Sequence, residues 1–150
     1  MRTHSHNLAE ARLAMANQSH VQMLLRGGSV WNQWRAAHPE IQPDLTGAYL
    51  TGADITEANL IKADLRGADL TQVGLHTADL TEAELEEADL TEATLIKADL
   101  IEAKVNEADL SGANFTKANP PPMLRCGALN LSRLTSVKRH ASTPTSVGLT

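Results

Sequence analysis

Apolar residues return at every fifth position through the middle of the chain. Fifteen consecutive positions at this spacing hold Leu, Ile, Val or Phe, from Leu45 to Phe115. A second series lies two residues ahead of the first. It begins with Pro43 and continues as Ala to Ala113, with Val73 as the larger exception. The pattern therefore predicts one uninterrupted repeat through the centre of the sequence.

A period of five fits neither a helix nor a plain strand. On a helix, five steps of about 100° rotate each Leu by roughly 140° from the last, so no apolar stripe forms. On a strand, an odd period sends successive Leu side chains to opposite faces. The pattern works if each unit is a short extended piece followed by a turn, with Ala and Leu inward and the fifth residue at the corner. Corners in every unit coil the chain into a tube.

The residues of the repeat unit resemble those of a known protein family. "ADLRGADL", "ADLTEAEL" and "ADLSGANF" are similar to the unit A-(D/N)-L-x-x of pentapeptide-repeat proteins, and the resemblance covers residues 43–119, about half the chain. It implies an all-β solenoid, a right-handed quadrilateral β-helix of nearly four coils with four units per coil, capped by short N-terminal α-helices. "VWNQWRAAHPEIQPDLTGA" is also similar to cyanobacterial members, in which a helical leader caps the first coil.

Residues 1–42 are predicted to form this helical cap, as two or three short amphipathic helices. The first candidate is "NLAEARLAMANQ". "SHVQMLLRGG" follows, with Ser19 as its N-cap and with Val21, Leu24 and Leu25 on one face. "SVWNQWRAAHPE" comes last, with Ser29 as its N-cap and with Val30, Trp31 and Trp34 on one face. We expect the two tryptophans to cover the first coil, because an open solenoid end exposes unpaired backbone.

Residues 120–150 are predicted to be a proline-rich stop followed by a basic tail. "PPP" at 120–122 ends the coils, since proline cannot donate to a backbone ladder. "MLRCGALNLSRLTSV" has apolar residues at helical spacing and predicts a short capping helix. The remaining polar stretch is typical of disorder.

Charge divides the chain in the same three parts. Residues 43–119 hold 16 acidic and five basic residues, a net charge of −11, whereas residues 1–42 carry +2 and residues 120–150 carry +4. The single Cys126 excludes an intrachain disulfide and fits a reducing compartment. No apolar run approaches the ~20 residues of a membrane span. We therefore expect a cytoplasmic protein that does not enter a membrane.

Four units per coil would stack residues that lie twenty positions apart. Two sides then keep the Asp between Ala and Leu, and two vary. The varying columns are Asp44–Asp64–Glu84–Lys104 and Asp54–Gly74–Thr94–Asn114. Among the outward positions, three apolar residues are candidates for docking a partner: Ile61, Ile96 and Ile101.

The outward residues do not indicate an enzyme. Asp64 and Glu84 would stack as two carboxylates, but on a convex, solvated wall that cannot shift a pKa or exclude water. His4 and His6 lie in a loose end, so we expect no metal site, and no residue pattern indicates a cofactor or a catalytic centre.

The sequence therefore predicts a non-enzymatic protein-interaction or scaffolding module for an unknown protein partner, with no direct binding of nucleic acid. It is expected to be a monomer or an end-to-end dimer through the last coil. The alternative is an acidic mimic of nucleic acid that binds a DNA-binding protein such as DNA gyrase, as the resemblance implies for some family members. Against mimicry, the tube is short and its basic ends offset the acidic field.

Overall fold

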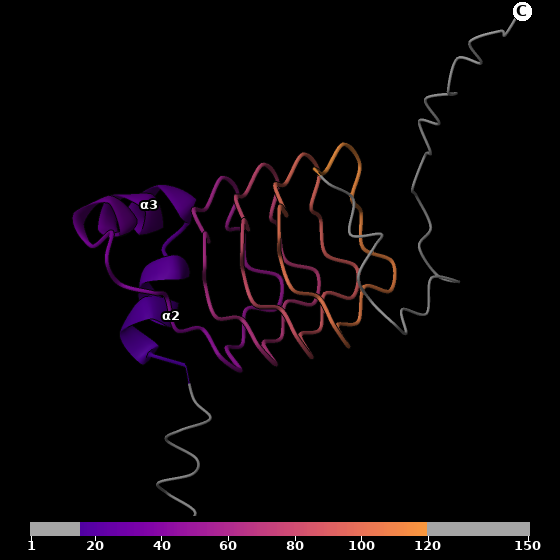
Figure 1. Cartoon of the computed structure of the whole chain (residues 1–150), viewed down its shortest axis with the longest axis horizontal. Helices are drawn as coiled ribbons and strands as arrows, with labels where there is room; N and C mark the ends of the chain where they lie inside the picture. Colours follow the sequence, from indigo (N-terminus) through magenta and orange to yellow (C-terminus); the bar gives the residue numbers. More distant parts are fainter. Residues whose placement is uncertain (1–15, 120–150) are drawn as a thin grey trace, which may run out of the picture.

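The computed structural model describes residues 16–119 as two helices followed by a stack of coils (Figure 1). Helix α2 spans Gln18–Leu24 and helix α3 spans Gly28–Ala37. Both lie at one end of the stack, against the first coil. Within the described part of the chain, no helix is long and apolar enough to cross a membrane.

The coils are held together by parallel backbone bridges between residues twenty positions apart. The series runs from Asp44 with Asp64 to Asp99 with Asn119. Each coil therefore contains four five-residue units. Every bridge in residues 16–119 is a single residue pair, because a turn interrupts the extended piece of each unit.

The stack has four sides, which we number in chain order. Residues 43–47, 48–52, 53–57 and 58–62 begin sides 1, 2, 3 and 4, and each later residue lies on the same side as the residue twenty positions before it.

A tight turn makes each corner, at the fifth residue of the unit as predicted. The amide of Ala48 donates to the carbonyl of Leu45 at 3.0 Å, and the same bond recurs in later units. The fifth residue has a positive φ, for example 64° at Gly47 and 57° at Lys62. Glycine adopts this conformation freely, whereas a side chain there carries strain of roughly 1–2 kcal/mol. Stacking between coils holds the strained corners in place.

The core is a narrow column of Leu and Ala side chains. Every position of the Leu series is buried, and most of the Ala series is buried beside it. Val73 is fully buried, so the larger residue fits the inward slot. The outward Asp or Asn has a structural role as well, because its Oδ1 accepts the amide two residues later, as in Asp89 to Thr91 at 2.9 Å.

The predicted N-caps of both helices are wrong. Asn17 caps α2, with its Oδ1 accepting the amides of Ser19 at 3.0 Å and His20 at 3.4 Å, so Ser19 lies inside the helix. Gly27 precedes α3 and provides no side-chain cap, so Ser29 lies in the first turn. Leu25 was expected on the buried face of its helix, but it lies beyond the helix and is 47% exposed.

The cap replaces a missing coil with side chains and one backbone amide. Trp31 is fully buried, and its Nε1 donates to the carbonyl of Asn59 at 2.7 Å. Asn32 accepts the amide of Asn59 at 2.7 Å. On side 1, the amide of Asp44 donates to Nδ1 of His20 at 3.0 Å, and the carbonyl of Asp44 accepts the amide of Asn17 at 3.1 Å. These bonds satisfy the first backbone edge on sides 1 and 4.

Some predictions fall outside the described residues. These are the proline stop at 120–122, the C-terminal capping helix and most of the helix expected over "NLAEARLAMANQ".

Candidate functional site

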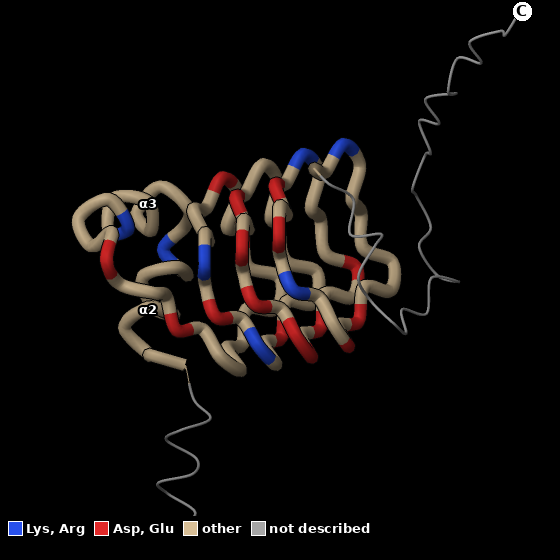
Figure 2. Tube along the Cα trace, in the orientation of Figure 1, with Lys and Arg blue, Asp and Glu red and all other residues tan. Residues whose placement is uncertain are grey.

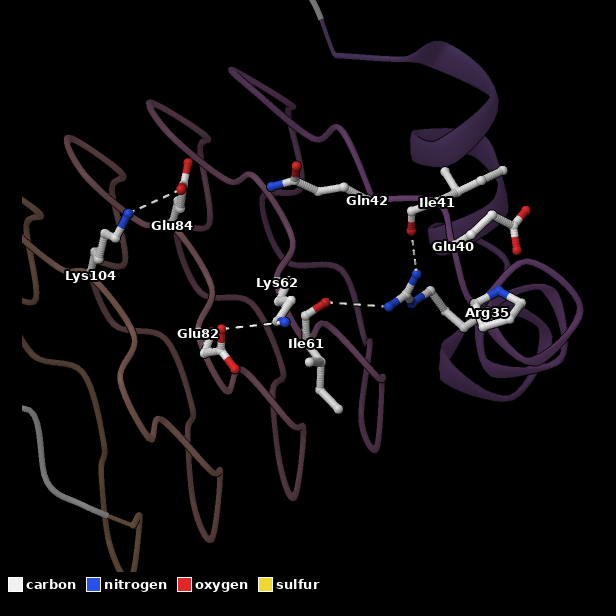
Figure 3. A pocket seen from close by; sticks show the side chains of 10 residues that line it. Arg35, Glu40, Ile41, Gln42, Ile61, Lys62, Glu82, Glu84 and Lys104 are labelled. Atoms are coloured by element: carbon white, nitrogen blue, oxygen red, sulfur yellow. Dashed lines mark hydrogen bonds and ion pairs between the residues drawn. The ribbon is translucent and has the colours of Figure 1, made fainter.

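A groove of about 360 Å³ lies between the segment after α3 and the flank of the coils (Figure 3). Ile41 and Ile61 contribute apolar surface, and they are twenty positions apart in the sequence. In the segment after α3, Ile41 therefore holds the position that Ile61 and Ile101 hold on side 4. The groove joins the cap and the solenoid into one surface.

Arg35 of α3 fixes the geometry of this groove. Its Nη1 donates to the carbonyl of Ile41 at 2.7 Å, and its Nη2 donates to the carbonyl of Ile61 at 3.3 Å. Burial lowers the pKa of Arg35 from its usual value, and the guanidinium remains charged because that value is so high. One half-buried side chain therefore connects the helix, the connecting segment and the first coil.

The outer wall of the groove carries charged side chains arranged in pairs. Lys62 lies 3.5 Å from Glu82, and Lys104 lies 3.1 Å from Glu84 (Figure 3). The two residues of each pair are twenty positions apart, so each pair joins adjacent coils. Such exposed pairs add little stability. They place charged side chains beside the apolar surface of Ile41 and Ile61.

The ion pairs continue away from the groove along side 1. Arg66 binds Asp64 through Nε at 2.9 Å and Nη2 at 2.5 Å, and it also approaches Glu84 at 3.5 Å. The hydrogen bond from Arg66 holds the pKa of Asp64 below its ordinary value, and the same bond raises the pKa of Arg66. The carboxylate of Asp64 is thus stabilised in its charged form, which does not suit a general acid.

The three predicted docking residues are only partly brought together. Ile61 is half-buried in the groove, and Ile101 is 40% exposed on the same side, with Thr81 between them. The ladder confirms this order, since the amide of Lys62 donates to Thr81 and that of Glu82 donates to Ile101. Ile96 is half-buried on side 3, one corner away. Two of the three therefore form a column.

Sequence reasoning did not place Arg35, Ile41, Lys62 or Glu82 in this site. A signal existed for three of them, because Ile41 and Ile61, and Lys62 and Glu82, are each twenty positions apart. No local pattern could have located Arg35, whose partners are set by how α3 docks. Among residues 16–119, no group of three or more His, Cys, Asp or Glu side chains is arranged to hold a metal ion.

Stacked five-residue units with an N-terminal helical cap define a repeat protein of the solenoid class. The sequence matches the family model of pentapeptide repeats, in eight copies, over residues 41–72 and 95–119. Among solved structures, a pentapeptide repeat protein from Nostoc Pcc 7120 is 31% identical with a TM-score of 0.53, over 60% of this chain and 72% of that one. The chain belongs to the pentapeptide-repeat family.

Two further solved structures are similar in sequence. A pentapeptide repeat protein from the cyanobacterium Cyanothece 51142 is 30% identical with a TM-score of 0.38, over 49% of this chain and 47% of that one. One from the thylakoid lumen of Arabidopsis thaliana is 33% identical with a TM-score of 0.40, over 51% of this chain and 60% of that one. Comparison with curated proteins found no match.

Proposed function

We propose that the protein is a non-enzymatic interaction module that binds a protein partner at the groove and along the Ile61–Thr81–Ile101 column of side 4. We also propose that the coils wind as a right-handed quadrilateral β-helix, which is supported by four units per coil and by the likeness to the Nostoc protein. The partner is expected to be a protein, with no direct contact to nucleic acid.

One observation carries the functional proposal. Apolar side chains at the groove and on side 4 lie beside paired charges, with Ile101 exposed and Ile61 half-buried. Protein interfaces commonly have this arrangement, in which an apolar centre is surrounded by a polar rim. The rigid stack fixes the column, so little conformational entropy is lost on binding.

An affinity pull-down from a lysate of the source cells tests this function. Wild type is compared with Ile61→Asp/Ile101→Asp and with the matched control Thr71→Asp/Ser111→Asp, which changes the same position of the unit on side 2. We expect a protein that wild type and the control retain and the side 4 variant loses. Equal retention by all three proteins, or no specifically retained protein, contradicts the proposal.

The acidic surface favours a second candidate function, mimicry of nucleic acid. Acidic residues recur along the stacked coils (Figure 2), and residues 43–119 carry a net charge of −11. A DNA-binding protein would meet this field as it meets phosphates. A supercoiling assay with DNA gyrase and the purified protein is the test. Loss of supercoiling at micromolar protein supports mimicry of this enzyme's substrate, and undiminished supercoiling excludes it.

A further inference from the structure

Side 3 differs in charge from the other three sides of the stack. Side 1 holds six acidic and two basic residues, side 2 holds four acidic and no basic residues, and side 4 holds four acidic residues and one basic residue. Side 3 holds two of each, which gives it no net charge. Its charged residues are Asp54, Glu57, Lys97 and Lys117. A second protein with acidic sides can therefore approach this side with the least repulsion.

The charges of side 3 are also separated along the stack. Asp54 and Glu57 lie in the first coil, next to the cap, whereas Lys97 and Lys117 lie in the third and fourth coils. Glu57, Lys97 and Lys117 all occupy the corner position of their unit, and all three are exposed. The corner is thus negative at one end and positive at the other.

Lys97 and Lys117 stack directly upon each other. The amide of Lys97 donates to the carbonyl of Thr116 at 2.9 Å, which places the two lysines in adjacent coils at one corner. In residues 16–119 neither lysine forms an ion pair, although Lys62 and Lys104 each pair with a Glu one coil away. Neighbouring like charges on a sheet are unfavourable. A carboxylate from outside the chain would relieve this repulsion.

Two small residues, Gly74 and Thr94, occupy the outward position between the inward ones at the centre of side 3. Gly74 stands where most units carry Asp or Asn, and its φ is not positive. A Cβ at this position would meet Oδ1 of Asp54 at 3.4 Å, an ordinary contact. Neither backbone conformation nor lack of space therefore requires glycine. Thr94 lies above Gly74, and His76 and Ile96, both half-buried, lie two residues further along the same two coils. Small side chains between them leave room for another surface.

We infer that side 3 is a self-association surface, on which a second copy of this chain packs in the antiparallel direction. A two-fold axis in the plane of contact, perpendicular to the stack, reverses the order of the coils and keeps each corner opposite the same corner of the other copy. Glu57 of each copy then faces Lys117 of the other. Gly74 faces Thr94, and His76 faces Ile96. This self-complementarity is what a two-fold symmetric interface requires.

The antiparallel arrangement on side 3 suits two copies better than other arrangements do. A parallel arrangement would place this corner against that of residues 52, 72, 92 and 112. Lys97 would then meet Glu92, but Glu57 and Lys117 would each meet a glycine and stay unpaired across the contact. Each of the other three sides would repel the same side of a second copy, since each has a net negative charge. Four coils at about 4.8 Å extend only ~19 Å, so the contact is small and the association is weak and sensitive to salt.

Sedimentation velocity of the full chain from about 10 µM to about 1 mM at low salt tests the inference. Wild type should shift from monomer towards dimer with rising concentration. Glu57→Lys alone and Lys117→Glu alone should each weaken the dimer about tenfold, because two contacts per dimer change from attraction to repulsion. The double variant Glu57→Lys/Lys117→Glu should return to within about threefold of wild type, because both contacts are restored with reversed sign.

All variants place Lys or Glu at the fifth position of a unit, where Lys62 and Glu82 already occur on side 4, so the corner can accept either residue. Glu102→Lys makes the same charge change as Glu57→Lys at the next corner, and it should leave the association unchanged. A wild type that stays monomeric to 1 mM overturns the inference. The inference is also overturned if the double variant does not recover the dimerisation of wild type, which would indicate another surface, such as the last coil. The side 4 pull-down is independent, because its groove lies at a different corner.

Discussion

At the scale of single residues, Gly28 decides whether the cap can dock. A Cβ at this buried position would lie 2.1 Å from the carbonyl oxygen of Thr56, a backbone atom that the ladder holds in place. We expect Gly28→Ala to lower the free energy of unfolding by about 1–3 kcal/mol, as overpacked sites do. Thermal denaturation followed by circular dichroism measures the effect. Ser29→Ala, one residue later on the exposed surface, is the control, and equal melting temperatures for both variants would contradict this account.

His20 makes the stability of the cap dependent on pH. Burial lowers the pKa of His20, contacts with Asp44 oppose this shift without reversing it, and the positive charge of Arg35 lowers the pKa further. Nδ1 accepts the amide of Asp44, which only an unprotonated nitrogen can do. Since the folded pKa is below the ordinary value near 6.5, the stabilisation is complete above about pH 6.5 and is lost as the pH falls through the folded pKa.

The variant His20→Asn tests this pH dependence. Its amide oxygen can accept from Asp44 and does not titrate. Urea unfolding of both proteins at about pH 8 and pH 5 should show a larger loss of stability for wild type than for the variant. The carboxylates titrate in both proteins, so the difference isolates the histidine. Parallel losses in the two proteins would show that His20 is not responsible.

At the scale of the repeat unit, the inward Leu positions hold the fold together. Leu75 is fully buried, with coils on both sides of it. Leu75→Asp places a carboxylate in a dry core, which costs several kcal/mol in a domain whose total stability is about 5–15 kcal/mol. We expect this variant to lose its β-type circular dichroism spectrum, whereas the neighbouring outward change His76→Asp keeps it. A folded Leu75→Asp protein would refute the inward assignment.

The units could be predicted from sequence because each repeats the same short extended piece and turn, with the same two inward positions. Leu45 to Phe115 stay in phase, and the stacking of residues twenty apart was expected from the resemblance to pentapeptide-repeat proteins, which implies four units per coil. The helix starts were not predictable in this way. Ser19 and Ser29 are both acceptable caps, but Asn17 is placed to bind two amides, and Gly28 must approach Thr56 closely. Each start also depends on a distant contact, since the amide of Asn17 donates to the carbonyl of Asp44 and Gly28 lies against Thr56, and no local pattern records such contacts.

The groove shows the same division between periodic and non-periodic residues. Ile61 and Ile101 were predicted as outward candidates, and their shared column follows from the period. Arg35 was missed, because its two carbonyl partners are assembled only when α3 docks on the first coil. Ile96 was predicted as a further outward residue, and it lies on side 3, because its separation from Ile61 is not a multiple of twenty.

At the scale of the whole molecule, the cap occupies part of the open backbone edge of the first coil. Trp31, Asn32 and Arg35 bind backbone groups of Asn59, Glu57 and Ile61 that would otherwise be unpaired at the end of the stack. Open β edges recruit other chains. The triple variant Trp31→Ala/Asn32→Ala/Arg35→Ala should therefore release the cap and expose a template for association.

Size-exclusion chromatography with light scattering measures this association at fixed protein concentration. We expect the triple variant to form large, heterogeneous species while keeping a β-type circular dichroism spectrum, because the later coils pair among themselves. Arg26→Ala/Ser29→Ala/Gln33→Ala changes three exposed residues of the cap and should elute as wild type does. A triple variant that stays folded and monodisperse would show that the first coil does not need these contacts. Complete loss of the spectrum would show that the cap holds the stack together as well as covering it.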